Sequence, residues 1–97
     1  MAAPHIVRDR LDHALLALAY GPDPLRGRLL SAATELTPLL DHDFEDARGN
    51  ALRSAINELL TRQQSLEASV AGLSDDELVR LAELIFELDS HYRPPYG

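Results

Sequence analysis

The sequence predicts an all-α protein in which four helices form one compact arrangement. Apolar residues recur at three- or four-residue spacing along most of the chain, and no stretch alternates as a half-buried strand would. Prolines, glycines and capping residues lie at the ends of the periodic segments. The length, 97 residues, is that of one domain. We therefore expect a single helical domain over residues 1–92 and a short extended tail over 93–97.

The first helix is expected over residues 4–20. Pro4 suits a first helical turn, where its missing N–H is not needed. Gly21 follows the last periodic residue and is typical of the position after a helix.

The second helix is expected over residues 24–37, close enough to the first to form an antiparallel hairpin. Asp23 is a candidate cap, and Pro24 fits the first helical position. We expect the helix to end at Thr37, because Pro38 disfavours the helical conformation of the residue before it.

The third helix is expected over residues 44–71, with a bend near 63–65. Asp41 and Asp43 are candidate caps for its start. The alternative is a break near that bend and a short separate helix over 65–71. The continuous helix is favoured by a four-and-three heptad spacing, which is followed by Leu52, Ile56, Leu59, Gln63, Leu66 and Val70.

The fourth helix, expected over residues 75–92, has the clearest start. Ser74 and Glu77 have the spacing of a capping box, in which each side chain accepts a hydrogen bond from the other residue's backbone N–H. Leu73 and Leu78 have the spacing of the hydrophobic staple that accompanies such a start.

The apolar residues of the fourth helix span roughly 220° of its circumference, whereas a surface helix needs an apolar stripe just over ~100° wide. In one interpretation the other three helices cover this arc on three sides. In the other, part of it, at Val79 and Phe86 or at Leu84, stays exposed and contacts a partner. Asp89 points into the arc, so it either reaches solvent or pairs with an arginine.

The chain is acidic, with nine basic residues against sixteen acidic ones and a formal charge of −7. Such a charge repels nucleic acid and anionic lipid, so neither is expected as a direct partner, and it favours basic proteins. The remaining sector of the fourth helix carries an acidic ridge of Asp76, Glu83 and Glu87. Arg80 interrupts the ridge, and we expect it to pair with Asp76 and Glu83.

Cysteine is absent, no segment has the ~18–20 continuous apolar residues of a membrane span, and the N-terminus lacks the pattern of a signal peptide. These features predict a cytoplasmic protein.

Two groups of side chains have compositions that could support a metal site or catalysis. His5, Asp9 and His13 share one face of the first helix, where histidines can bind a metal, but a solvated face is the simpler interpretation. Residues 41–43, Asp-His-Asp, could supply a general base or a cation site, and we expect helix capping instead. No catalytic residue, metal or cofactor is therefore predicted, and the protein is expected not to be an enzyme.

The arginines near the first hairpin are the chain's main basic concentration. We expect them to pair with nearby acids rather than to bind phosphate. These arginines are Arg8, Arg10, Arg26 and Arg28, and the acids are Asp9, Asp12 and Asp23.

Three segments resemble small uncharacterised bacterial helical proteins. They are residues 10–19, RLDHALLALA; residues 38–44, PLLDHDF; and residues 73–88, LSDDELVRLAELIFEL. The resemblance implies an all-helical bacterial protein and assigns neither a function nor a site residue.

From these features we expect a non-enzymatic protein–protein interaction subunit, an accessory or adaptor of a bacterial complex that binds a second copy or another protein. An acidic inhibitor of the immunity or antitoxin type, directed at a basic surface, is the alternative. Leu16 and Tyr20 lie opposite the apolar stripe of the first helix and form either a small contact patch or ordinary isolated exposed residues. The candidate contact residues are Val79, Leu84, Phe86, Leu16, Tyr20, Asp76, Glu83 and Glu87.

Overall fold

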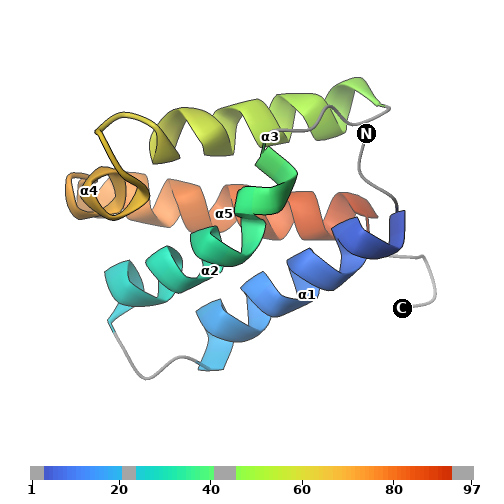
Figure 1. The fold of residues 1–97 in the computed structure, drawn as a ribbon, viewed down its shortest axis with the longest axis horizontal. Coiled ribbons are helices and arrows are strands. Elements are labelled where there is room, and N and C mark those ends of the chain that lie inside the picture. The colour runs from blue at the N-terminus through green and yellow to red at the C-terminus, as the bar shows by residue number, and fades with distance from the viewer. Residues whose placement is uncertain (1–3, 21–23, 41–45, 93–97) are drawn as a thin grey trace.

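The computed structural model describes residues 4–20, 24–40 and 46–92, with side chains described over 8–19, 24–39 and 46–92. This part of the chain is helical and contains no strand, which confirms the predicted all-α class (Figure 1). The helices are α1 (Pro4–Tyr20), α2 (Leu25–Leu40), α3 (Ala47–Leu60), α4 (Leu66–Ala71) and α5 (Asp75–Tyr92). Over residues 4–20, 24–40 and 46–92, the structure therefore has four long helices and one short helix in place of the four that the sequence predicts.

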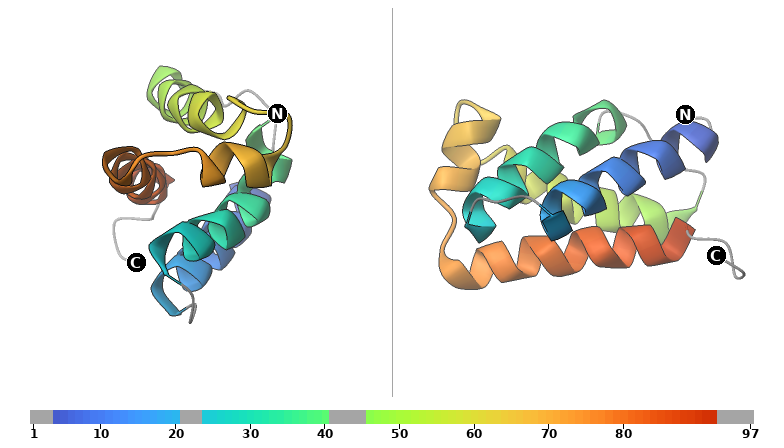
Figure 2. Two further views of the ribbon diagram at one scale, coloured as in Figure 1. Left: turned by 90° about the vertical axis from the view of Figure 1, so that its left-hand side faces the viewer. Right: turned by 90° about the horizontal axis from the view of Figure 1, so that it is seen from below.

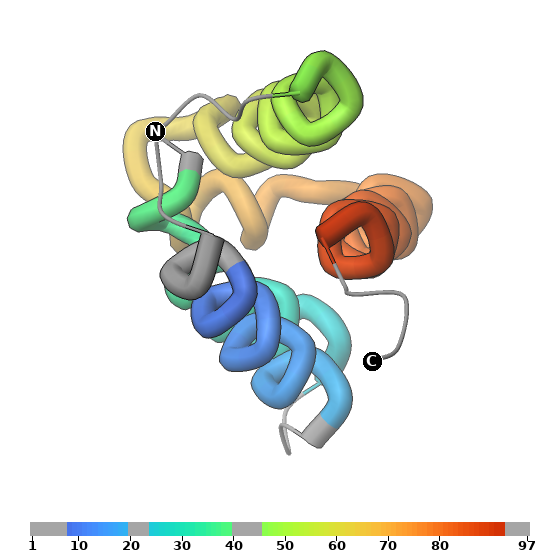
Figure 3. The backbone as a smooth tube through the Cα atoms, turned by 90° about the vertical axis from the view of Figure 1, so that its right-hand side faces the viewer, coloured from blue at the N-terminus to red at the C-terminus, as the bar shows by residue number. Residues whose placement is uncertain are grey.

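The last helix, α5, packs against α1, α2 and α3. The α1–α2 hairpin lies on one side of α5, and α3 runs antiparallel to α5 on another side (Figures 1 and 3). The short helix α4 lies across one end of the molecule, where it contacts α2 and α3 (Figure 2). No helix in the described ranges is long and apolar enough to cross a membrane.

The core between these helices consists of aliphatic side chains. All five helices contribute to it, because each presents one apolar stripe inward. The largest fully buried apolar side chains are Leu11, Leu29, Leu36, Leu39, Ile56, Leu81, Ile85, Leu88 and Val70.

The ends of α1 agree with the prediction, but the predicted end of α2 is wrong. The helix continues through Pro38 to Leu40. Proline cannot donate to the carbonyl of Thr34, and the Thr37 hydroxyl donates to that oxygen instead, at 2.8 Å. Leu39, which is 1% exposed, also gains apolar burial from the extra turn.

The start of α2 lies one residue later than expected. Pro24 precedes the helix, and its carbonyl accepts the first helical hydrogen bond from the backbone N–H of Arg28, at 3.0 Å. The predicted caps Gly21 and Asp23 lie outside the described residues.

The favoured continuous third helix is wrong, and the alternative of a break is correct. Helix α3 ends at Leu60, and α4 begins after Ser65, whose hydroxyl accepts from the Ala68 N–H at 3.0 Å. The buried Ser69 hydroxyl stabilises the turn between them. It accepts from the backbone N–H of Gln63 at 3.0 Å and donates to the Ser65 carbonyl at 2.9 Å.

The start of α3 also differs from the prediction. Its N-cap is Asp46, which accepts from the backbone N–H of Gly49 at 2.8 Å. The expected caps Asp41 and Asp43 lie outside the described residues, as does the predicted start at residue 44.

Helix α5 has the predicted bounds and the predicted start. The Ser74 backbone N–H donates to the Glu77 carboxylate at 2.9 Å, and the Glu77 N–H donates to the Ser74 hydroxyl at 3.2 Å. Leu73 and Leu78, the expected staple, are both buried in the core.

Candidate functional site

Helix α5 is fixed on the side that faces α1 by an ion pair whose acidic member is buried. Asp89, which is 4% exposed, accepts a hydrogen bond from the guanidinium of Arg8. Burial lowers the pKa of Arg8, but its bonds to Asp89 and Asp12 outweigh that effect, and the net shift is upward. Of the two alternatives expected for Asp89, solvent or an arginine, the structure shows the arginine, which gives this carboxylate a structural role.

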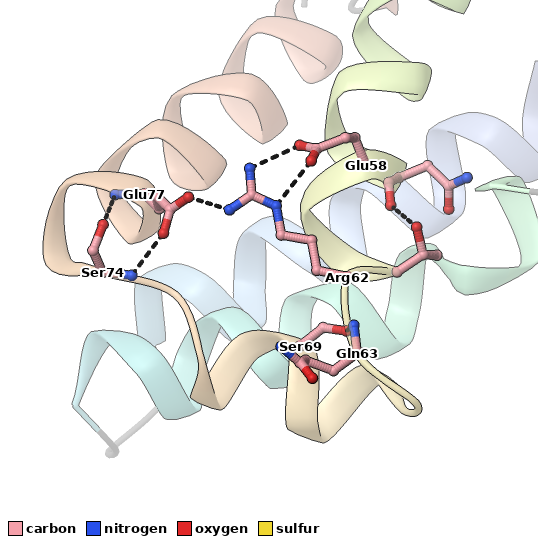
Figure 4. A network of polar contacts seen from close by, with 8 residues as sticks. Glu58, Arg62, Gln63, Ser69, Ser74 and Glu77 are labelled. Carbon is pink, nitrogen blue, oxygen red and sulfur yellow. Dashed lines mark hydrogen bonds and ion pairs between the residues drawn. The ribbon is translucent and has the colours of Figure 1, made fainter.

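The N-terminal end of α5 is held to the end of α3 by Arg62 (Figure 4). Its guanidinium donates to Glu58 at 2.8 Å and also binds Glu77 of the capping box. Hydrogen bonds from the Ser74 backbone N–H and from the Arg62 guanidinium lower the pKa of Glu77 to about 2. This carboxylate is therefore committed to holding two helices together.

The C-terminal end of α5 is held to the start of α3 by Asp46. Besides capping α3, this carboxylate accepts from the Tyr92 hydroxyl at 2.8 Å and binds the His91 ring. The backbone N–H of Gly49, then Tyr92 and His91, lower the pKa of Asp46 to about 2. No local pattern in the sequence predicts this contact, because its partners lie more than 40 residues apart.

Between these two attachments, α5 presents a surface that no other helix in the described part of the chain covers. Val79 and Phe86 are each 50% exposed, so this flank of the apolar arc stays open. Leu84 is only 2% exposed, so its place among the candidate contact residues is wrong. Leu84 lies on the flank that α3 covers. On that flank, Arg48 of α3 pairs with Glu87 of α5, and Arg62 of the turn after α3 pairs with Glu77.

The acidic ridge divides into a paired and an unpaired part. Glu87 binds Arg48 of α3 at 2.9 Å. Asp76, Arg80 and Glu83 are exposed, and no ion pair forms among these three described side chains. The expected pairing of Arg80 is therefore wrong, consistent with the small net gain from fixing exposed, flexible side chains. We call Asp76, Val79, Arg80, Glu83 and Phe86 the outer face of α5.

Helix α1 carries a separate exposed leucine, Leu16, which is 53% exposed. The side chain of its expected neighbour, Tyr20, lies outside the described side chains. The rest of that face is polar: His13 approaches Asp9 at 3.9 Å and Glu35 of α2 at 3.7 Å. The third member of the expected histidine group, His5, is likewise not described at the side-chain level.

Metal chemistry gains no support from the described residues. Among them, no three or more His, Asp and Glu side chains are arranged to hold a metal ion. Residues 41–43 lie outside the described ranges.

The arginines of the first hairpin serve internal contacts. Arg8 pairs with Asp12 as expected, whereas Arg10 binds Glu35 at 3.4 Å. Arg26 and Arg28 mainly bind carbonyls instead of the expected acids: Arg26 donates to Val70, Ala71 and Leu73 oxygens, and Arg28 donates to the Leu18 oxygen. The carbonyls at helix C-termini lack internal donors and carry partial negative charge, which makes them good partners for guanidinium groups.

Shallow depressions also follow the edge between α2 and α4. One of about 420 Å³ is mainly apolar and lies beside Gly27, Leu30 and Val70, and a neighbouring one of about 550 Å³ lies beside Ser31, Thr34 and Glu67. The first is lined mainly by aliphatic carbons, and the second is lined by hydroxyl groups together with the Glu67 carboxylate.

Comparison of the chain with protein-family models, with curated proteins and with solved structures gave no match.

Proposed function

We propose that this protein is a non-enzymatic interaction subunit, an accessory or adaptor of a bacterial cytoplasmic complex, and that it binds another protein through the outer face of α5. The observation that carries the proposal is the exposure of Val79 and Phe86 on a helix whose opposite side is already fully packed. These two side chains are seven residues apart, so they lie on one line about 10 Å long, two turns of the helix.

The packing energetics support an external role for these side chains. Complete burial of a valine or phenylalanine contributes about 1.5–3 kcal/mol, and each of these residues still exposes half of its surface. A partner that covers both would therefore gain on the order of 2 kcal/mol from this apolar line. Since the core is complete without that contact, the outer face is available for binding without loss of the fold.

A capture experiment with matched variants tests this function. The tagged wild-type chain, a Val79→Ser/Phe86→Ser double variant and a Leu16→Ser control would be used to capture proteins from the organism that produces the chain. We expect wild type and the control to retain the same partner, or a second copy detected by light scattering, and the double variant to lose it. Equal retention by all three, with folding verified by circular dichroism, would contradict the proposal.

An acidic inhibitor is the second candidate function. The exposed carboxylates of Asp76 and Glu83, which form no ion pair with Arg80, favour it. In that case charge dominates binding, so Asp76→Asn/Glu83→Gln would weaken capture more than Val79→Ser/Phe86→Ser does. The opposite ranking supports the interaction subunit.

A further inference from the structure

The arrangement of charge around the apolar line of α5 indicates what kind of partner it fits. Val79 has an acidic residue three and four positions before it, Asp76 and Asp75, and another four positions after it, Glu83. Glu83 also lies three positions before Phe86. Positions three and four apart are neighbours on a helix surface, so the apolar line is bordered by three carboxylates.

These carboxylates carry charge that the fold leaves largely uncompensated. Asp76 and Glu83 form no ion pair within the part of the chain that the structure describes, and Asp75 is fully exposed, with Arg26 only at 3.9 Å. Arg80, the single cation of the outer face, lies about 100° around the helix from Val79. A ligand on the apolar line therefore meets acids before it meets this arginine.

From this geometry we infer that the occupant of the outer face is a basic amphipathic helix of another protein. The inference rests on the proposed function and names its partner class. Such a helix places apolar side chains at positions i and i+7 against Val79 and Phe86, and lysines or arginines beside Asp76 and Glu83. The apolar line is only two turns long, so its area gives little selectivity between partners. Complementary charge supplies that selectivity instead.

A second copy of this chain fits the surface less well. Each copy has a formal charge of −7, and a symmetric contact would bring like-charged faces together.

A peptide titration followed by NMR tests the inference. Three synthetic helical peptides of about 18 residues would be added to the full ¹⁵N-labelled chain. The first has an apolar face flanked by lysine and arginine, the second has the same apolar face flanked by glutamate, and the third has the composition of the first with its apolar positions scrambled. We expect only the first to bind, with amide shifts concentrated over residues 75–90 and with affinity that falls as salt rises.

Two variants that remove the same charge serve as a matched pair. Glu83→Gln is expected to weaken binding of the basic peptide about two- to threefold, the size of one exposed charge contact. Glu67→Gln removes an equal charge from α4, away from the outer face, and should leave the affinity unchanged. Val79→Ser/Phe86→Ser should abolish the shifts over residues 75–90.

The inference is overturned if no peptide binds, if the acidic or scrambled peptide binds as tightly as the basic amphipathic one, or if the shifts fall elsewhere. It also fails if Glu67→Gln weakens binding as much as Glu83→Gln does. Its failure is distinguishable from failure of the proposed function. If Val79→Ser/Phe86→Ser still loses the captured partner, the function stands and only the basic helix as its partner is rejected.

Discussion

Both sides of α5 carry large apolar residues, but the other helices bury those of the inner side and leave those of the outer side exposed. On the inner side, Leu81, Ile85 and Leu88 are almost completely buried against the other long helices. On the outer side, Val79 and Phe86 remain half exposed. The wide apolar arc therefore joins a core stripe to a separate exposed line. The width of an apolar arc on a helical wheel includes both the residues that pack into the core and those that stay exposed. Only the packing of the other helices separates the two groups.

The largest expected effect comes from the inner side. Ile85→Ala should lower the free energy of unfolding by about 2–5 kcal/mol, because it leaves a cavity among fully buried side chains. Phe86→Ala removes more atoms but should cost less than about 1 kcal/mol, since half of that side chain is already in water. Urea unfolding of both variants measures the difference. An equal loss of unfolding free energy in the two variants would contradict the distinction between a buried inner side and an exposed outer side.

The next effect concerns the ion pair at the edge of the inner side. Arg8→Leu should destabilise the protein by about 2–4 kcal/mol, because the Asp89 carboxylate stays buried without the guanidinium charge. The double variant Arg8→Leu/Asp89→Leu should recover part of that loss, since neither charge is then buried. Denaturant midpoints give both values. A double variant no more stable than Arg8→Leu would show that the two side chains do not act as a pair.

The attachments at the two ends of α5 should make stability depend on acid pH. Folding lowers the pKa of Asp46 from 3.8 and that of Glu77 from 4.5, in both cases to about 2. The folded state therefore favours the ionised carboxylates. Their contribution is fully present above about pH 4.5 and is lost as pH falls towards 2. Unfolding free energies across this range should decline, with a shallower decline for Asp46→Asn. An unchanged decline in that variant would contradict the role of Asp46.

The smallest effect on stability is expected at isolated exposed residues. Leu16→Ser should change the free energy of unfolding by less than about 0.5 kcal/mol, because more than half of the Leu16 side chain is exposed. Thermal unfolding measures this change. A loss of more than about 1 kcal/mol would mean that Leu16 belongs to the packed surface, and it would then not serve as a control for the outer face.

Features set by neighbouring residues could be predicted from the sequence. The capping box at Ser74 placed the start of α5, and helical periodicity with Pro4 placed α1. The wheel position of Asp89 required either solvent or an arginine, and the structure contains the arginine. Each of these predictions rested on contacts within a few positions or on the cost of burying a charge.

Features set by hydrogen bonds between side chains and the backbone, or by contacts between distant residues, could not be predicted from the sequence. The Thr37 hydroxyl bonds the carbonyl that Pro38 leaves without a donor, and the buried Ser69 stabilises the turn that interrupts the heptad pattern. Asp46 binds the end of α5 across nearly half of the chain. On the candidate surface, Val79 and Phe86 were expected, whereas the burial of Leu84 depended on how α3 packs.

The most direct test of the outer face is site-specific photo-cross-linking in the organism that produces the protein. A photoreactive amino acid would replace Phe86 in one version of the chain and Thr34, an exposed position on the α2–α4 edge, in another. We expect a discrete cross-linked product from position 86 and none of the same mass from position 34. The same product from both positions, or a product from position 34 alone, would contradict the assignment of the outer face of α5 as the binding surface.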